Sequence, residues 1–88
     1  MRALVTGGAI RLGREMALYL GQQGFDVAVH YARSTEAANE TVGEIQAMGR
    51  KSVALQANLL EDSGSQPLIA RAVEGLGGSL TLLVNNAS

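Results

Sequence analysis

Thr6-Gly7-Gly8-Ala9-Ile10-Arg11-Leu12-Gly13 lies between two segments of different apolar pattern. The short apolar run Leu4-Val5 precedes it, and from Leu12 onward the apolar residues follow helical spacing, which predicts a strand, a glycine-rich turn and a helix. Such a turn lets the backbone come close to a pyrophosphate, and the helix N-terminus adds free N–H groups and positive partial charge. The alternative is that Gly7 and Gly8 only make a tight turn. Arg11 favours a nucleotide site, because a cation beside a positive helix end implies a compensating anion.

The rest of the chain alternates between strand and helix patterns. Apolar runs bounded by glycine or polar residues predict strands at 25–31, 52–56 and 80–84. Helical spacing predicts helices from residue 12 to near Gly21 or Gly24, from Ser34 or Thr35 to Gly49, and after a Ser-x-x-Gln capping box at 63–66. The continuously apolar 80–84 run is typical of a parallel strand covered on both faces. We therefore expect an α/β fold, a doubly wound parallel sheet of Rossmann type, of which residues 1–88 form the β-α-β-α-β-α-β portion.

Length, charge and composition exclude several classes of protein. The 88 residues carry 7 basic and 8 acidic side chains, which leaves no basic stripe for nucleic acid, and 47% apolar residues are too many for a disordered chain. Without cysteine there is no disulfide framework or thiolate metal site, and no apolar run approaches the roughly 20 residues that span a bilayer. Met1 leads into the first strand without a signal peptide, so we expect a cytoplasmic protein with no membrane or nucleic-acid partner.

The end of the predicted 25–31 strand indicates which nicotinamide cofactor the site prefers. An NAD site has an acidic residue about 20 positions beyond the glycine turn, but Arg33 stands there. Asp26 lies at the other end of the strand, roughly 16 Å from the ligand edge. Residues at that edge offer donors that suit a 2′-phosphate, namely His30, Tyr31, Arg33 and Ser34. NADP(H) is therefore preferred over NAD(H). Alternatively, Arg33 faces solvent and Ser34 only caps a helix. We interpret His30 as a spacer or hydrogen-bond partner more than as a catalytic base, because no nucleophile lies near it in sequence.

Amide side chains follow the third and fourth predicted strands. Asn85-Asn86-Ala87-Ser88 comes directly after the 80–84 run, and Asn58 follows the 52–56 strand. The carboxyl ends of parallel strands form the ligand crevice of an open α/β sheet. The paired amides could bind a ligand there or could lock the strand ends together. Asn58 could accept the amino group of an adenine, or it could be an asparagine of a loop turn.

These segments together resemble the short-chain dehydrogenase/reductase family over the whole chain. The family's Thr-Gly-x-x-x-Gly-x-Gly signature and its Asn-Asn-Ala-Gly strand ending match 6–13 and 85–88, with Arg11 and Ser88 in place of two glycines. These replacements, and the segment His30-Tyr31-Ala32-Arg33-Ser34, look like the pteridine-reductase branch. The resemblance implies Arg11 near the pyrophosphate and substrate, Arg33 and Ser34 at the 2′-phosphate, and Ser88 beside the nicotinamide. The family usually has Asp where this chain has Asn58, and an amide can still accept the adenine bond. The cofactor-binding residues that we expect are Gly7, Arg11, Leu12, Gly13, His30, Tyr31, Arg33, Ser34, Asn58, Leu59, Asn86, Ala87 and Ser88.

The catalytic residues of the family, a Ser and a Tyr-x-x-x-Lys set, come after its fourth strand and are absent from the 88 residues. Tyr19 and Tyr31 have no lysine four positions on. We expect residues 1–88 to be the N-terminal, cofactor-binding half of one domain in an NADP(H)-dependent oxidoreductase, which transfers hydride from NADPH to a carbonyl or pterin-type substrate. Expected partners are the remainder of its own fold, a small-molecule substrate and, by family analogy, further copies in a dimer or tetramer. The alternative is a non-catalytic NADP(H)-binding regulatory or redox-sensing module. A freestanding domain fits poorly, because a sheet edge would be left uncovered.

Overall fold

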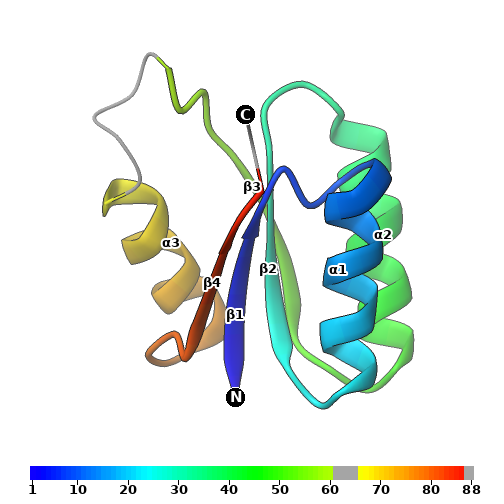
Figure 1. Ribbon diagram of the computed structural model, residues 1–88. Helices are drawn as coiled ribbons and strands as arrows, with labels where there is room; N and C mark the ends of the chain where they lie inside the picture. The colour runs from blue at the N-terminus through cyan, green and yellow to red at the C-terminus, as the bar shows by residue number, and fades with distance from the viewer. Residues whose placement is uncertain (61–65, 87–88) are drawn as a thin grey trace.

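A parallel sheet of four strands forms the centre of the molecule (Figure 1). The structure is a computed structural model that describes residues 1–60 and 66–86. The strands lie in the order β3-β2-β1-β4 and comprise β1 (Arg2–Thr6), β2 (Asp26–Tyr31), β3 (Ser52–Gln56) and β4 (Leu82–Asn85). The predicted doubly wound parallel sheet is confirmed, and each predicted strand lies within two residues of the observed one.

Helices pack on both faces of this sheet. In Figure 1, α1 (Arg11–Gln22) and α2 (Thr35–Ala47) lie to its right, and α3 (Gln66–Leu76) lies to its left. Side chains alternate along the strands, so that Val5, Val27 and Val29 join the core under α1 and α2, whereas Leu4 and Ala28 join the core under α3. Complete burial of a valine or leucine side chain contributes about 1.5–3 kcal/mol. Both faces of β1 and β2 are buried, which explains why their sequences are nearly continuous apolar runs.

Glycines end two helices where the sequence predicts. Gly24 and Gly49 have φ of 100° and 86°, so the chain leaves α1 and α2 through the left-handed conformation that glycine adopts easily. Ser34 is the N-cap of α2, as predicted, but its side chain makes no capping hydrogen bond. The Ser-x-x-Gln capping box predicted at 63–66 lies, apart from Gln66, outside the described residues.

β4 lies at an edge of the sheet, and the described residues do not cover it on both faces as the sequence predicts. Leu82 and Leu83 are 37% and 44% exposed. Within the described residues, β4 pairs only with β1, and the helices pack mainly over the other three strands. Apolar side chains on both faces of an edge strand form a surface that further polypeptide can bury.

The sequence order of the strands reverses between β1 and β4. The chain first builds outward from β1 to β3, then returns to place β4 on the other side of β1. In open parallel sheets, ligands bind beyond the carboxyl ends of the strands at such a point. The register pairs Thr6 with Asn85, so the chain segments that follow these residues leave the sheet side by side. Asp26 lies at the opposite edge, as predicted, where its Oδ1 accepts a 2.9 Å hydrogen bond from Lys51 N.

Candidate functional site

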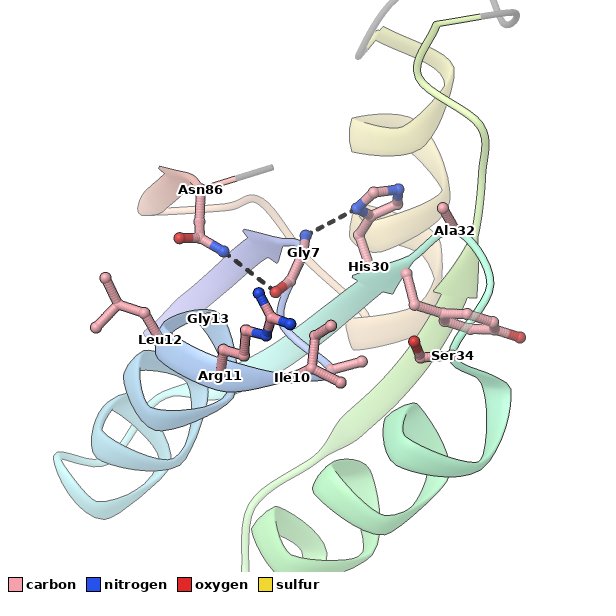
Figure 2. Close-up of a pocket in the computed structure, with 11 residues that line it drawn as sticks. Gly7, Ile10, Arg11, Leu12, Gly13, His30, Ala32, Ser34 and Asn86 are labelled. Atoms are coloured by element: carbon pink, nitrogen blue, oxygen red, sulfur yellow. Dashed lines mark hydrogen bonds between the residues drawn. The ribbon is translucent and has the colours of Figure 1, made fainter. Parts of the chain in front are cut away.

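A pocket of about 400 Å³ opens at the carboxyl edge of the sheet, beside the turn that follows β1. Its volume is in the range of small-molecule sites. Its walls come from this turn and the start of α1, from the end of β2 and the start of α2, and from the segment after β4 (Figure 2). The lining residues are Gly7, Ala9, Ile10, Arg11, Leu12, Gly13, His30, Tyr31, Ala32, Ser34 and Asn86.

The peptide groups of Gly7 are bound from two sides by neighbouring strands. Figure 2 shows Gly7 between His30 and Asn86. Gly7 N donates to His30 Nδ1 at 2.9 Å, and Asn86 Nδ2 donates to Gly7 O at 3.2 Å. The next amide, Gly8 N, donates to His30 O at 3.0 Å. Gly7 has a φ of 63°, so it needs the conformational freedom of glycine, and these bonds fix the one conformation that the turn uses.

The amides after β4 lock the strand ends together, which was one of the two alternatives left by the sequence. Asn86 N donates to Thr6 Oγ1 at 2.9 Å, and the Thr6 hydroxyl lies 3.3 Å from both Val84 O and Asn85 Oδ1. Sequence reasoning missed Thr6 as a site residue. The available signal was a hydroxyl at the carboxyl end of an otherwise apolar strand. Asn86 also lines the pocket, so locking does not remove it from the ligand surface.

Gly13 is held at a position that no other residue can occupy without movement of the backbone. It lies in the first turn of α1, and a Cβ there would overlap Gly7 O and come within 2.6 Å of Asn86 Nδ2. Real Cβ atoms do not approach other atoms so closely, so the turn, the helix and Asn86 would have to separate. The third glycine of the 6–13 segment is therefore required by close packing of the helix against the turn.

Arg11 begins α1 in a left-handed conformation, with a φ of 53°. A non-glycine residue there costs roughly 1–2 kcal/mol. The N-cap, Ile10, has no side-chain capping bond, and the first turn of the helix contains no acidic residue. The first N–H groups of a helix have no partner within it. This end of the pocket therefore combines free amide donors, a helix dipole and a guanidinium, all of which favour an anion.

His30 differs from the other residues expected at the edge, because it does not offer a donor to the pocket. Its side chain is buried, and both ring nitrogens bond to the backbone: Nδ1 accepts from Gly7 N, and Nε2 lies 2.9 Å from Ala57 O. The expectation that His30 could donate to a 2′-phosphate was wrong for this reason. The interpretation as a hydrogen-bond partner is confirmed.

The remaining predicted residues are distributed unevenly around the pocket. Tyr31 and Ser34 line it, whereas Arg33 is exposed and is not among the lining residues. Asn58 and Leu59, which follow β3, do not line the pocket either. Asn58 Oδ1 accepts from Leu60 N at 3.2 Å, which is the loop-turn arrangement considered for it. Ala87 and Ser88 lie outside the described residues, and Leu59 packs partly buried against the α3 core.

The pocket carries no acidic side chain among the lining residues of the described chain. Its ionisable groups are the Arg11 guanidinium, the Tyr31 phenol and the imidazole of His30. In the described ranges 1–60 and 66–86, no cluster of three or more His, Asp or Glu side chains could hold a metal ion. No described helix is long and apolar enough to cross a membrane.

Comparison with known proteins agrees with this architecture. The sequence model for the family described as short chain dehydrogenase matches residues 1–88. The chain belongs to the short-chain dehydrogenase family. The 3-oxoacyl-[acyl-carrier-protein] reductase FabG of Staphylococcus aureus is 46% identical over 85 residues, which are 97% of this chain and 34% of that protein. The chain thus spans about a third of the length of this short-chain dehydrogenase relative.

Two solved structures share the same fold. FolM alternative dihydrofolate reductase 1 from Brucella suis, in complex with NADP, superimposes with a TM-score of 0.90 at 37% identity, covering 99% of this chain and 34% of that one. A short chain dehydrogenase from Burkholderia cenocepacia, also in complex with NADP, gives a TM-score of 0.92 at 41% identity and covers 99% and 35%. Both complexes contain the same dinucleotide.

Gly13→Ala tests whether close packing at the turn is required. We expect this substitution in the intact protein to lower the free energy of unfolding by about 1–3 kcal/mol, because the new methyl group must displace Gly7 O. Gly43→Ala is the matched control, since a Cβ there meets nothing within 4 Å and Ala favours a helix by about 0.5–1 kcal/mol. Urea unfolding of both variants measures the difference. Equal stability of the two would contradict the packing argument.

Proposed function

We propose that this chain is the NADP(H)-binding portion of a reductase that transfers hydride from NADPH to a carbonyl or pterin-type substrate. The observation that supports this proposal most directly is the start of α1, which attracts anions. Arg11 adopts a left-handed conformation there, beside uncapped amides at the pocket. Family membership and the NADP complexes of two similar structures support the same conclusion.

The start of α1 would hold the pyrophosphate of the dinucleotide. Its free N–H groups and helix dipole attract a phosphate oxygen, and Arg11 adds a formal positive charge. Gly7 puts no side chain into the pocket that it lines, so a ligand can approach the backbone there, and Gly13 lets α1 pack closely against the turn. An anion bound here would offset both the helix dipole and the unfavourable position of the cation.

The end of β2 and the start of α2 would hold the 2′-phosphate of the cofactor. Ser34 lines the pocket, and its hydroxyl is not used to cap α2. Arg33 is exposed next to it, and its long side chain can reach a phosphate bound there. No carboxylate is among the residues that line the pocket, and each charge-assisted bond to a dianion is worth about 1.5–3 kcal/mol. Tyr31 offers a further donor on the same side.

The other expected contacts lie around the same edge. We assign the adenine to Asn58 and Leu59, which follow β3, and the nicotinamide end to Asn86 and the adjoining residues 87 and 88, which follow β4. These assignments follow the sheet order, since the two ends of a dinucleotide lie on either side of the point where the strand order reverses.

Hydride transfer needs groups that residues 1–88 do not contain. When bound, NADPH supplies the hydride, while the residues described above bind and orient it. The proton donor would come from a Tyr-x-x-x-Lys set elsewhere in the protein, because no such spacing occurs in this sequence. We propose that this further part of the fold also covers β4, whose apolar side chains are exposed.

Arg33→Asp tests the assignment of the 2′-phosphate. In the intact protein we expect NADPH affinity to fall by about tenfold to a hundredfold, with little change for NADH, because a charge-assisted bond is replaced by repulsion. Lys51→Asp makes the same change in net charge at the opposite edge of the sheet and is the control. Fluorescence titration with both cofactors gives the ratio of affinities. An unchanged ratio in Arg33→Asp would exclude the assignment.

A substrate panel tests the proposed reaction. We expect the intact protein to oxidise NADPH in the presence of a ketoacyl thioester or a pterin, which represent the substrates named for FabG and for FolM. A quinone provides a third electron acceptor of different shape. Absorbance at the reduced nicotinamide band reports turnover. Tight NADPH binding without turnover on carbonyl, pterin or quinone would favour the non-catalytic regulatory module.

Leu83→Asn tests whether further polypeptide covers β4. Leu83 is 44% exposed here, but we expect its replacement to destabilise the intact protein by about 2–4 kcal/mol, as for a buried leucine. Leu60→Asn is the control, because Leu60 is 97% exposed and a substitution at such a surface position changes stability by less than about 0.5 kcal/mol. If both variants unfold at the same denaturant concentration as the parent protein, β4 is not covered.

A further inference from the structure

His30 connects three segments of the chain at the carboxyl edge of the sheet. Its Nδ1 accepts from Gly7 N at 2.9 Å, its backbone oxygen accepts from Gly8 N at 3.0 Å, and its Nε2 lies 2.9 Å from Ala57 O. The residue is only 3% exposed. One residue of β2 thereby joins the turn after β1 to the chain that leaves β3.

The partners of the ring specify its protonation state. A backbone N–H can only donate, so Nδ1 must carry a lone pair, and a carbonyl oxygen can only accept, so Nε2 must carry the hydrogen. His30 is therefore the neutral tautomer with the proton on Nε2. In this form it has no N–H left for a phosphate and no free lone pair to act as a base.

We propose that His30 is a positioning residue for cofactor binding, which presets the glycine turn through its Nδ1 lone pair. This inference rests on the proposed function, because the preset turn matters only if the pocket binds NADPH. Gly7 has a φ of 63° and, as a glycine, would otherwise sample many conformations. A turn that must be ordered during binding weakens the affinity by the cost of ordering it. The Nδ1 bond removes that cost in advance.

The second side-chain bond of His30 has a separate role. The Nε2 hydrogen bond to Ala57 O holds the end of β3 against β2 and does not touch the turn. Loss of the Nδ1 bond leaves the part-buried amide of Gly7 without its side-chain partner, whereas loss of the Nε2 bond leaves the glycine turn intact. The two bonds therefore predict different effects on NADPH affinity, and two substitutions can separate them.

His30→Asn keeps the first bond, because the amide oxygen of asparagine can take the place of Nδ1. His30→Gln keeps the second, because its longer side chain places an amide N–H near the place of Nε2. In the intact protein we expect His30→Asn to keep NADPH affinity within about threefold and His30→Gln to lose at least about tenfold. Fluorescence titration gives the affinity of each variant, and urea unfolding gives its stability. Ile45→Val, on the buried face of α2, is the control for stability loss away from the turn.

The outcomes distinguish failure of the proposed function from failure of the positioning role of His30. If the parent protein binds no NADPH, the proposed function fails and the inference fails with it. If the parent binds NADPH but the two His30 variants lose affinity equally, or only in proportion to their loss of stability as Ile45→Val does, the positioning role alone is wrong. Rescue by His30→Asn, with loss in His30→Gln at equal stability, supports the role of the Nδ1 lone pair.

Discussion

The two peptide groups of one residue, Gly7, connect the elements that meet at the carboxyl edge of the sheet. His30 accepts its N–H from β2, and Asn86 donates to its carbonyl oxygen from the end of β4. The same carbonyl lies where a Cβ of Gly13 would be, so the start of α1 can pack only if that residue has no side chain. Two strands and a helix are thus placed relative to one another through a single turn, which also lines the pocket.

This arrangement leaves unfavourable electrostatics at the start of α1. The helix has no side-chain cap and no acid in its first turn, and Arg11 adds a positive charge in a left-handed conformation. Folding alone gives no reason for these features, because each of them is unfavourable in the free protein. A bound phosphate would make the positive end of the helix dipole and the charge of Arg11 favourable to stability. The same division between a rigid scaffold and a locally strained site is common where a protein binds a charged ligand.

The sequence predicts the alternation of strands and helices well because apolar runs bounded by glycine are a local signal. The sequence predicts less well the contacts that depend on the register between paired strands. The role of His30 arises only when parallel pairing brings Gly7 to one side of the ring and Ala57 to the other. The exposure of β4 is equally hidden, since the apolar run containing Leu83 does not show which chain covers it. The left-handed φ of Arg11 follows from the turn and not from the residue type.

In the proposed function, the pocket at the turn after β1 binds NADP(H) through its phosphates. A crystal structure of the intact protein grown with NADP⁺ tests it most directly. We predict that the pyrophosphate lies at the N-terminus of α1 beside Arg11, with the 2′-phosphate between Ser34 and Arg33. A dinucleotide bound at another edge of the sheet, or one whose 2′-phosphate contacts neither of these residues, would overturn the proposed mode of binding.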